Sequence, residues 1–174
     1  MKILVIYFSY SGNNRLLTEY LGKRIGGDIC PIVEEKRRTF LTIILDMMFN
    51  REPNIKNLEY PISNYDHIIL AAPIWDLKLA HPMKSLVRRE KADLVNYSFI
   101  SLCGYKRPGQ KESISKSLTD LTGHPPKAVF ELNISELFPA EKRNDIKTVS
   151  RYRATNDDLN TYESQINEFL KLIR

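Results

Sequence analysis

The chain has 174 residues, of which 43% are hydrophobic and 27% are charged. This length suits one domain that can bury a core, so we expect a single domain over residues 1–174 of ordinary soluble composition. The N-terminal apolar run is short and is not followed by a small-residue cleavage site, and no stretch approaches the roughly 20 apolar residues of a membrane span. We therefore expect a cytoplasmic protein without a membrane span.

Two cysteines and a net charge of +5 limit the classes of function further. Cys30 and Cys103 have the spacing of neither a metal cluster nor a redox pair, so we expect reduced, buried thiols and no metal. Residues 84–111 carry seven basic and two acidic side chains, a net +5 that equals the excess of the whole chain. This segment is either a solvated basic face or a surface for anionic small molecules or acidic partners. We expect no nucleic acid, because no recognition motif accompanies the charge.

Strand and helix patterns alternate along the chain. Apolar runs rich in β-forming residues predict five strands, at residues 2–8, 29–33, 67–72, 97–103 and 127–133. Apolar residues at helical spacing predict helices at residues 13–26, 39–49, 82–90, 109–122 and 156–173. Such alternation is typical of βαβ units with right-handed crossovers. We expect an α/β fold, a doubly wound five-stranded parallel sheet of order 2-1-3-4-5 with helices on both faces.

Two segments exceed this minimal plan. Residues 39–49 (TFLTIILDMMF) have more apolar side chains than one helix face needs. We expect them to form the second crossover helix, either as a buried helix or with part of it serving as a homodimer contact or a lid over an apolar ligand. Residues 137–154 are expected to form a surface excursion, with or without one short helix.

The loop after the first strand, SYSGNN, is rich in small hydrogen-bonding residues. Ser9, Ser11, Asn13 and Asn14 offer side-chain donors, and Gly12 allows close approach of the backbone. The next helix directs its N-terminal N–H groups and its positive dipole end to the same place. The loop lacks the lysine of a triphosphate-binding loop, so it favours a monophosphate ester. An ordinary strand-to-helix turn is the alternative.

The loops after the third and fourth strands carry aromatic and basic residues. Trp75, the only tryptophan, follows the third strand and could flank a flat ring or anchor the loop as a core residue. Tyr105 offers a second aromatic ring after the fourth strand, next to Lys106 and Arg107. His81 could titrate near neutral pH, but a structural role is favoured. Ligands of open α/β sheets bind beyond the carboxyl ends of the strands, so these loops together indicate a phosphorylated planar ligand.

The chain resembles the flavodoxin family over roughly residues 2–132. ILVIYFSYSGNN is similar to the family's strand and phosphate loop, and NYDHIILAAPIW…HPMKSL is similar to its later strand and ring-binding loop. The resemblance implies a flavodoxin-like fold with FMN as cofactor. It assigns the FMN phosphate to Ser9, Ser11, Gly12, Asn13 and Asn14. It assigns the flavin ring to Pro73, Ile74, Trp75 and Asp76 on one side, and to Cys103, Gly104 and Tyr105 on the other.

Three departures from the family pattern shape the expected function. Asn14 stands where threonine is usual, and Asp76-Leu77 replaces a glycine that permits backbone rearrangement near the flavin. The third loop is basic, whereas electron-carrier flavodoxins present acidic surfaces. We therefore expect an FMN-dependent oxidoreductase that passes electrons from NAD(P)H to a small acceptor such as a quinone. The alternatives are a flavodoxin-type electron carrier and a flavin-free interaction module.

Overall fold

The structure, a computed structural model, describes residues 1–36, 38–49 and 51–173. Its centre is a five-stranded parallel sheet of order β2-β1-β3-β6-β7. The strands are β1 (Ile3–Tyr7), β2 (Asp28–Pro31), β3 (His67–Ala71), β6 (Tyr97–Cys103) and β7 (Val129–Asn133). In order of the main-sheet strands along the chain this is 2-1-3-4-5, so the predicted topology is confirmed.

The direction in which successive strands are added to the sheet reverses between β1 and β3. Leu4 of β1 lies opposite Asp28 of β2 on one side and opposite Ile68 of β3 on the other. The chain therefore winds outward from β1 in one direction and then crosses back to continue in the other. This arrangement makes the carboxyl ends of β1 and β3 the topological switch point, where open α/β sheets bind ligands.

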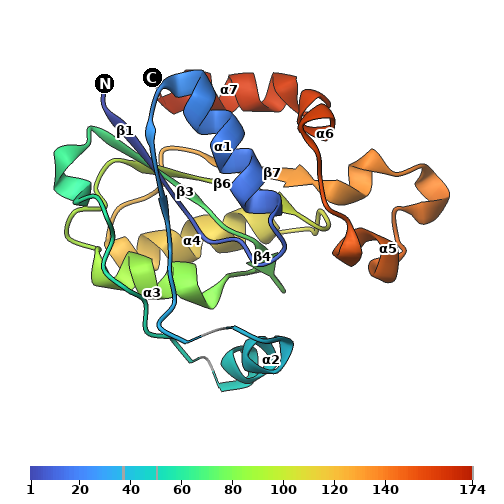
Figure 1. The fold of residues 1–174 in the computed structure, drawn as a ribbon, viewed down its shortest axis with the longest axis horizontal. Helices are drawn as coiled ribbons and strands as arrows, with labels where there is room; N and C mark the ends of the chain where they lie inside the picture. Colours follow the sequence, from blue (N-terminus) through green and yellow to red (C-terminus); the bar gives the residue numbers. More distant parts are fainter. Residues whose placement is uncertain (37, 50, 174) are drawn as a thin grey trace.

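Helices cover both faces of the sheet (Figure 1). One face is covered by α1 (Asn13–Ile25), α6 (Asn156–Asn160) and α7 (Glu163–Ile173), and the other by α3 (His81–Arg89) and α4 (Gln110–Thr122). Leu17 of α1 and Phe169 of α7 belong to one hydrophobic cluster, while Met83 of α3 and Ile114 of α4 belong to the other. Alternate residues of the strands supply both clusters, which is why the strands are apolar without alternation.

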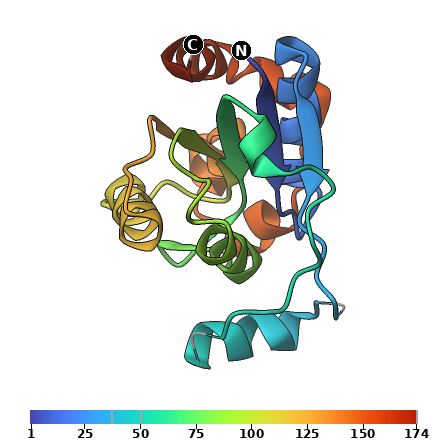
Figure 2. The same cartoon turned by 90° about the vertical axis from the view of Figure 1, so that its left-hand side faces the viewer.

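Helix α2 (Phe40–Phe49) forms within the predicted residues 39–49, but it does not pack on a face of the sheet as a crossover helix would. Both views show it set apart from the sheet, beyond the carboxyl ends of the strands (Figures 1 and 2). The expectation of a buried crossover helix is wrong, because Leu41, Met48 and Phe49 are 64%, 70% and 64% exposed. Within the described residues, no helix is both long and apolar enough to cross a membrane.

The remaining segments add short elements that the sequence patterns do not resolve. A two-stranded hairpin, β4 (Ile74–Trp75) and β5 (Lys78–Leu79), follows β3, and a 3₁₀ turn at Ile62–Asn64 precedes it. A second 3₁₀ turn, Ile134–Leu137, leads into the predicted excursion at residues 137–154, which contains a third 3₁₀ turn at Ala140–Lys142 and helix α5 (Ile146–Arg151).

The predicted helix over residues 156–173 is divided into α6 and α7. Thr155 and Asp158 form a capping box that starts α6. Tyr162 lies between the two helices and is 2% exposed, and its hydroxyl donates to the carbonyl of Asn133 at 2.6 Å. The division at this point lets one side chain reach the end of β7.

Candidate functional site

The candidate site lies at the switch point, where the loops after β1, β3 and β6 meet. The loop after β1 spans residues 9–12 and leads directly into α1. Gly12 is the N-cap of α1 with φ 94°, a left-handed conformation that favours glycine, and no side chain caps the helix. The Gly12 N–H donates to Ser9 Oγ at 3.1 Å, so Ser9 stabilises the turn. The first N–H groups of α1 consequently remain available to an anion.

The side chains of Asn13 and Asn14 are used within the chain. Asn14 makes two hydrogen bonds to Leu102 of β6, donating from Nδ2 to the carbonyl at 3.2 Å and accepting from the N–H at 2.9 Å. Asn13 donates to the carbonyl of Tyr152 at 3.1 Å and accepts from the N–H of Ala154 at 3.0 Å. Both side chains therefore fix the start of α1 to distant segments. Each Nδ2 uses one of its two N–H donors in these bonds, so the contact with a phosphate stays a prediction.

The loop after β3 contains a strained two-residue turn. Asp76 and Leu77 join β4 to β5 with φ of 48° and 63°, both in the left-handed region that non-glycine residues rarely adopt. Arg107 forms an ion pair with Asp76 at 3.0 Å, and Ser113 Oγ donates to the Leu77 carbonyl at 2.9 Å. Strain of this kind persists only where neighbouring contacts enforce it, and it gathers at functional sites.

Trp75 is half-buried and contacts two residues, Phe8 and Arg38, that the sequence pattern does not predict as its neighbours. Its ring packs edge-on against Phe8, with centroids 6.0 Å apart and an interplanar angle of 88°. The guanidinium of Arg38 lies 5.8 Å from the Trp75 ring and 5.9 Å from the Phe8 ring. Trp75 thus anchors its loop to the end of β1 and to the segment just before α2, and the Arg38 cation lies near both rings.

The loop after β6 starts from a buried thiol. Cys103 lies 4% exposed, and burial raises the pKa of its thiol to about 12. Gln110 donates from Nε2 to Cys103 Sγ at 3.7 Å and to the Tyr105 carbonyl at 3.2 Å. Val149 of α5 approaches Gly104, where an added Cβ would lie 3.6 Å from it. Cys103 is therefore a protonated, structural thiol, and the excursion packs on this loop.

Tyr105 carries a buried hydroxyl without a hydrogen-bond partner among the described residues. Burial is the main reason why the pKa of this hydroxyl is raised, and the nearby Asp145 carboxylate raises the pKa further. The Tyr105 ring packs with the α1 and α7 cluster, whereas Trp75 packs with the α3 and α4 cluster. The two aromatic residues therefore pack on opposite faces of the sheet, Trp75 in β4 and Tyr105 in the loop after β6.

His81 starts α3 close to the same edge. It is 4% exposed, its Nδ1 has no partner within the described part of the chain, and burial lowers its pKa despite the opposing field of Asp46. The basic segment beside it is partly neutralised, because Glu52 binds Lys84 at 3.4 Å and Arg88 at 3.2 Å. The net charge of residues 84–111 thus overstates their attraction for an anion.

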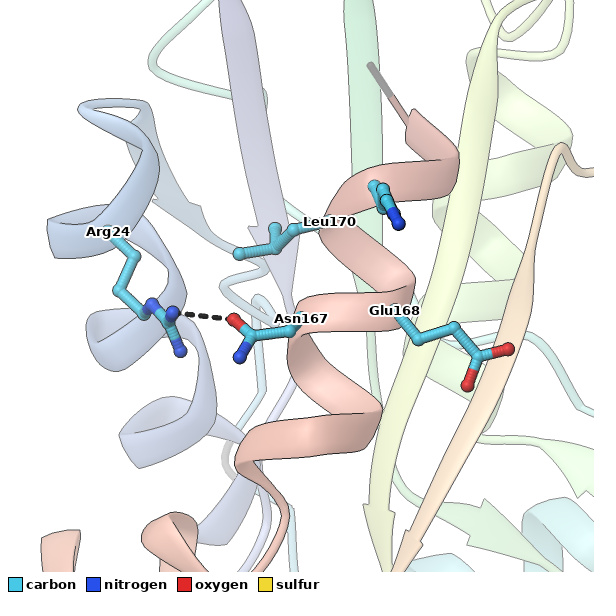
Figure 3. Close-up of a pocket in the computed structure, with 5 residues that line it drawn as sticks. Arg24, Asn167, Glu168 and Leu170 are labelled. Atoms are coloured by element: carbon cyan, nitrogen blue, oxygen red, sulfur yellow. Dashed lines mark hydrogen bonds between the residues drawn. The ribbon is translucent and has the colours of Figure 1, made fainter.

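Two cavities among the described residues lie away from the three loops. One of about 550 Å³ is lined by Arg24 near the end of α1 and by residues of α7, with Arg24 donating to Asn167 at 2.7 Å (Figure 3). Another, of about 270 Å³, lies under α2 and is lined by Glu34, Arg38 and Asp46, among others. None of the three loops lines either cavity, so the candidate site rests on the loops' own geometry.

Comparisons with known proteins support the fold. No family model and no curated protein matches the sequence. A Lactobacillus acidophilus flavoprotein solved in complex with FMN is 19% identical with a TM-score of 0.63, over 75% of this chain and 93% of that chain. A Bacteroides eggerthii protein provisionally named a flavoprotein is 22% identical with a TM-score of 0.66, over 86% of this chain and 98% of that one. At these identities the likeness establishes the flavodoxin-like fold, which the resemblance implied.

Proposed function

We propose that the protein binds FMN at the switch point and acts as an oxidoreductase that passes electrons from NAD(P)H to a small acceptor such as a quinone. The observation that carries the proposal is the uncapped start of α1, which follows a left-handed Gly12 at the end of β1. The structurally similar Lactobacillus acidophilus protein is described as an FMN complex, which supports the choice of cofactor.

The donor set at this end fits a monophosphate ester. The first-turn N–H groups of α1 and the Ser11 hydroxyl are neutral donors, and the helix dipole favours an anion. An added Cβ at Gly12 would meet no atom within 4 Å, so the space beside the loop is open. Arg15 lies in the first turn but pairs with Glu19 at 3.4 Å, which moderates its charge.

Bound FMN would supply the two-electron exchange, and the chain would hold and orient the ring. Trp75 in β4 and Tyr105 in the loop after β6 offer aromatic surface on opposite faces of the sheet. The unpartnered Tyr105 hydroxyl is a donor that a ring carbonyl or nitrogen could satisfy. Lys106 is exposed and forms no ion pair within the described residues, so it would attract an anionic nicotinamide nucleotide.

An electron carrier is the second candidate. The pairing of Lys84 and Arg88 with Glu52 weakens the charge argument against it, because the basic surface is smaller than the sequence indicates. Oxidation of NADH or NADPH by the purified flavin-loaded protein, in the presence and absence of quinones, separates the two. Turnover supports the oxidoreductase, and its absence with retained FMN supports the carrier.

The first experiment is the visible absorption spectrum of the purified protein, recorded before and after addition of excess FMN and desalting. Retained oxidised-flavin bands are expected. A colourless protein that leaves all FMN in the small-molecule fraction would contradict the proposal and favour a flavin-free interaction module.

A charge substitution then locates the phosphate. Ser11→Asp places a carboxylate at the loop and is expected to weaken FMN binding about tenfold or more by like-charge repulsion, which corresponds to about 1.4 kcal/mol. Ser164→Asp, an equivalent change on the exposed surface of α7, serves as the control and should leave the dissociation constant unchanged. Equal FMN affinity in the two variants would remove the phosphate from this loop.

A further inference from the structure

Helix α2 turns its apolar side to solvent. Leu41, Ile44, Met48 and Phe49 are exposed, by 64%, 37%, 70% and 64% respectively. At about 100° per residue, these four side chains fall within one arc of the helix. Ile43 and Asp46 are buried on the opposite side, 7% and 8% exposed. The helix is thus inverted relative to an ordinary surface helix, since its acidic residue faces the protein and its apolar stripe faces outward.

A salt-bridge cluster fixes this orientation. Arg38 binds Asp46 at 2.8 Å and also Glu34, and the three side chains are 6%, 11% and 10% exposed. The same guanidinium lies over Phe8 and Trp75, which ties α2 to the end of β1. Rotation of α2 to bury its apolar side would break these ion pairs. The outward apolar face is therefore held in place by the structure.

The protrusion of α2 makes this face accessible to a flat partner. In both views α2 is the outermost element beyond the carboxyl edge of the sheet (Figures 1 and 2). A plane can therefore touch the helix along its length without meeting the sheet or its covering helices. An amphipathic helix that lies in a lipid interface requires this kind of access.

Charges around the apolar face favour an anionic partner. Lys36 precedes α2 and Arg51 follows it, both exposed, and the Arg51 guanidinium lies 5.7 Å from the Phe49 ring. Most acidic residues between positions 34 and 52 form ion pairs. Arg38 pairs with Glu34 and Asp46, and Glu52 pairs with Lys84 and Arg88, while Glu35 is exposed. Lys78 of β5 and Lys106 in the loop after β6 add exposed positive charge at the carboxyl edge of the sheet.

A second copy of the chain fits this face less well. A ten-residue helix is about 15 Å long and about 10 Å wide, so one face presents far less than the ~800 Å² per partner of a standard interface. Extending such a contact would bring the basic flanks of two copies together, and like charges oppose association.

We propose that α2 docks the protein onto an anionic lipid surface, with Leu41, Ile44, Met48 and Phe49 in the acyl boundary and Lys36 and Arg51 at the head groups. Apolar burial supplies the attachment, and the basic flanks select anionic lipid. The proposal stands apart from flavin binding, because it needs neither the switch-point loops nor a cofactor.

Co-sedimentation with vesicles tests the proposal with the full chain. Vesicles of phosphatidylcholine alone are compared with vesicles of equal parts phosphatidylglycerol and phosphatidylcholine. The wild type is expected to bind the anionic vesicles, and the variant Met48→Glu with Phe49→Glu to bind about tenfold or more weakly. The control variant Val95→Glu with Leu172→Glu carries the same charge change at positions 55% and 48% exposed, and should retain binding within about twofold.

Three outcomes would overturn the proposal. Failure of the wild type to sediment with anionic vesicles would exclude the lipid surface, and equal binding to both vesicle types would exclude the selection of anionic lipid. Equal loss in the two double variants would show that added negative charge, rather than α2, matters.

Sedimentation equilibrium of the vesicle-free protein completes the test. If the wild type does not bind vesicles but forms a dimer, and the variant Met48→Glu with Phe49→Glu is a monomer, the exposed face of α2 binds a second copy instead. Near-ultraviolet circular dichroism verifies that each variant is folded.

Discussion

Trp75 serves as an anchor in the structure and, in the proposed function, as one wall of the flavin site. We expect Trp75→Ala to weaken FMN binding by about 1–3 kcal/mol, the range found when a base loses an aromatic stacking partner. Trp75→Phe keeps an aromatic face and should retain most of the affinity. Quenching of flavin fluorescence during titration gives the dissociation constants. If the alanine variant binds FMN as well as the wild type, Trp75 acts only on Phe8 and Arg38.

Leu77 tests the strain in the same loop. Its φ of 63° lies in the left-handed region, which costs an L-residue about 1–2 kcal/mol. We expect Leu77→Gly to raise the free energy of unfolding by about 1 kcal/mol, since glycine adopts this conformation without a clash. Glu168→Gly, in the exposed middle of α7, should lower it by about the same amount. Urea denaturation measures both, and a loss of stability in Leu77→Gly would mean that side-chain contacts outweigh the backbone strain.

At the scale of single residues, the sequence locates the loops better than it assigns their side chains. Gly12 and Ser11 follow a strand, so their place at its carboxyl end is predictable from local pattern. Local pattern predicts that Asn13 and Asn14 donate to a phosphate, but it does not predict the hydrogen bonds of their amides to Tyr152 and Leu102. Those partners are 139 and 88 residues away in the chain, and local pattern contains no information about them.

Among the elements, α2 depends most on one residue. Arg38→Ala would leave Glu34 and Asp46 buried without their cation, a change that typically costs about 3–5 kcal/mol when both charges stay buried. Because α2 is peripheral, we expect the helix to detach and expose the carboxylates, so the loss is local. Amide hydrogen exchange of residues 41–49 should accelerate strongly, while exchange in β1 and β3 stays unchanged.

Arg15→Ala is the matched control for this change. Arg15 and Glu19 form an exposed pair, 64% and 51% accessible, whose removal should alter stability by less than about 0.5 kcal/mol. Slow exchange of α2 in the Arg38 variant would show that Ile43 and the helix backbone, rather than the ion pairs, hold α2 in place.

The elements also show which patterns predict structure and which do not. The apolar stripe of α1 predicts its burial, because the stripe has one covering sheet to face. The stripe of α2 predicts a helix but not its orientation, since that is set by Arg38, a residue outside the helix. Apolar spacing predicts one helix over residues 156–173 and not its division into α6 and α7. The start of α6 is visible as Thr155 and Asp158, the two residues of the capping box.

For the whole molecule, topology follows from the sequence because strand patterns alternate with helix patterns, and crossovers between parallel strands are right-handed as a rule. Tertiary packing then adds a relation between the two proposals. The candidate flavin loops and α2 lie at the same carboxyl edge of the sheet (Figure 1). If both proposals hold, the flavin would face the lipid surface, and an acceptor dissolved in the bilayer could reach it with a short path.

Global stability should fall as the pH is lowered from about 7 toward 5. Burial lowers the pKa of His67 and of His81 in the folded protein below the ordinary histidine value of about 6.5. The unfolded chain therefore takes up protons first as the pH drops through 6.5, which favours unfolding, and each unit of lowered pKa corresponds to about 1.4 kcal/mol. Above pH 7 both states hold neutral imidazoles, and this contribution to stability is complete.

Urea midpoints measured across this pH range check the sign and the source. His81→Gln should flatten part of the dependence, because burial lowers the pKa of His81 most. Asp46 opposes this shift, whereas Lys84, Arg38 and Lys78 add to it. His124→Gln, on the exposed turn after α4, should leave the dependence as it is. Glu131 acts in the opposite direction, since burial raises the pKa of its carboxyl and its protonation favours the fold at low pH. A stability that rises on acidification in the wild type, and equally in His81→Gln, would show that Glu131 dominates and that the buried histidines contribute little.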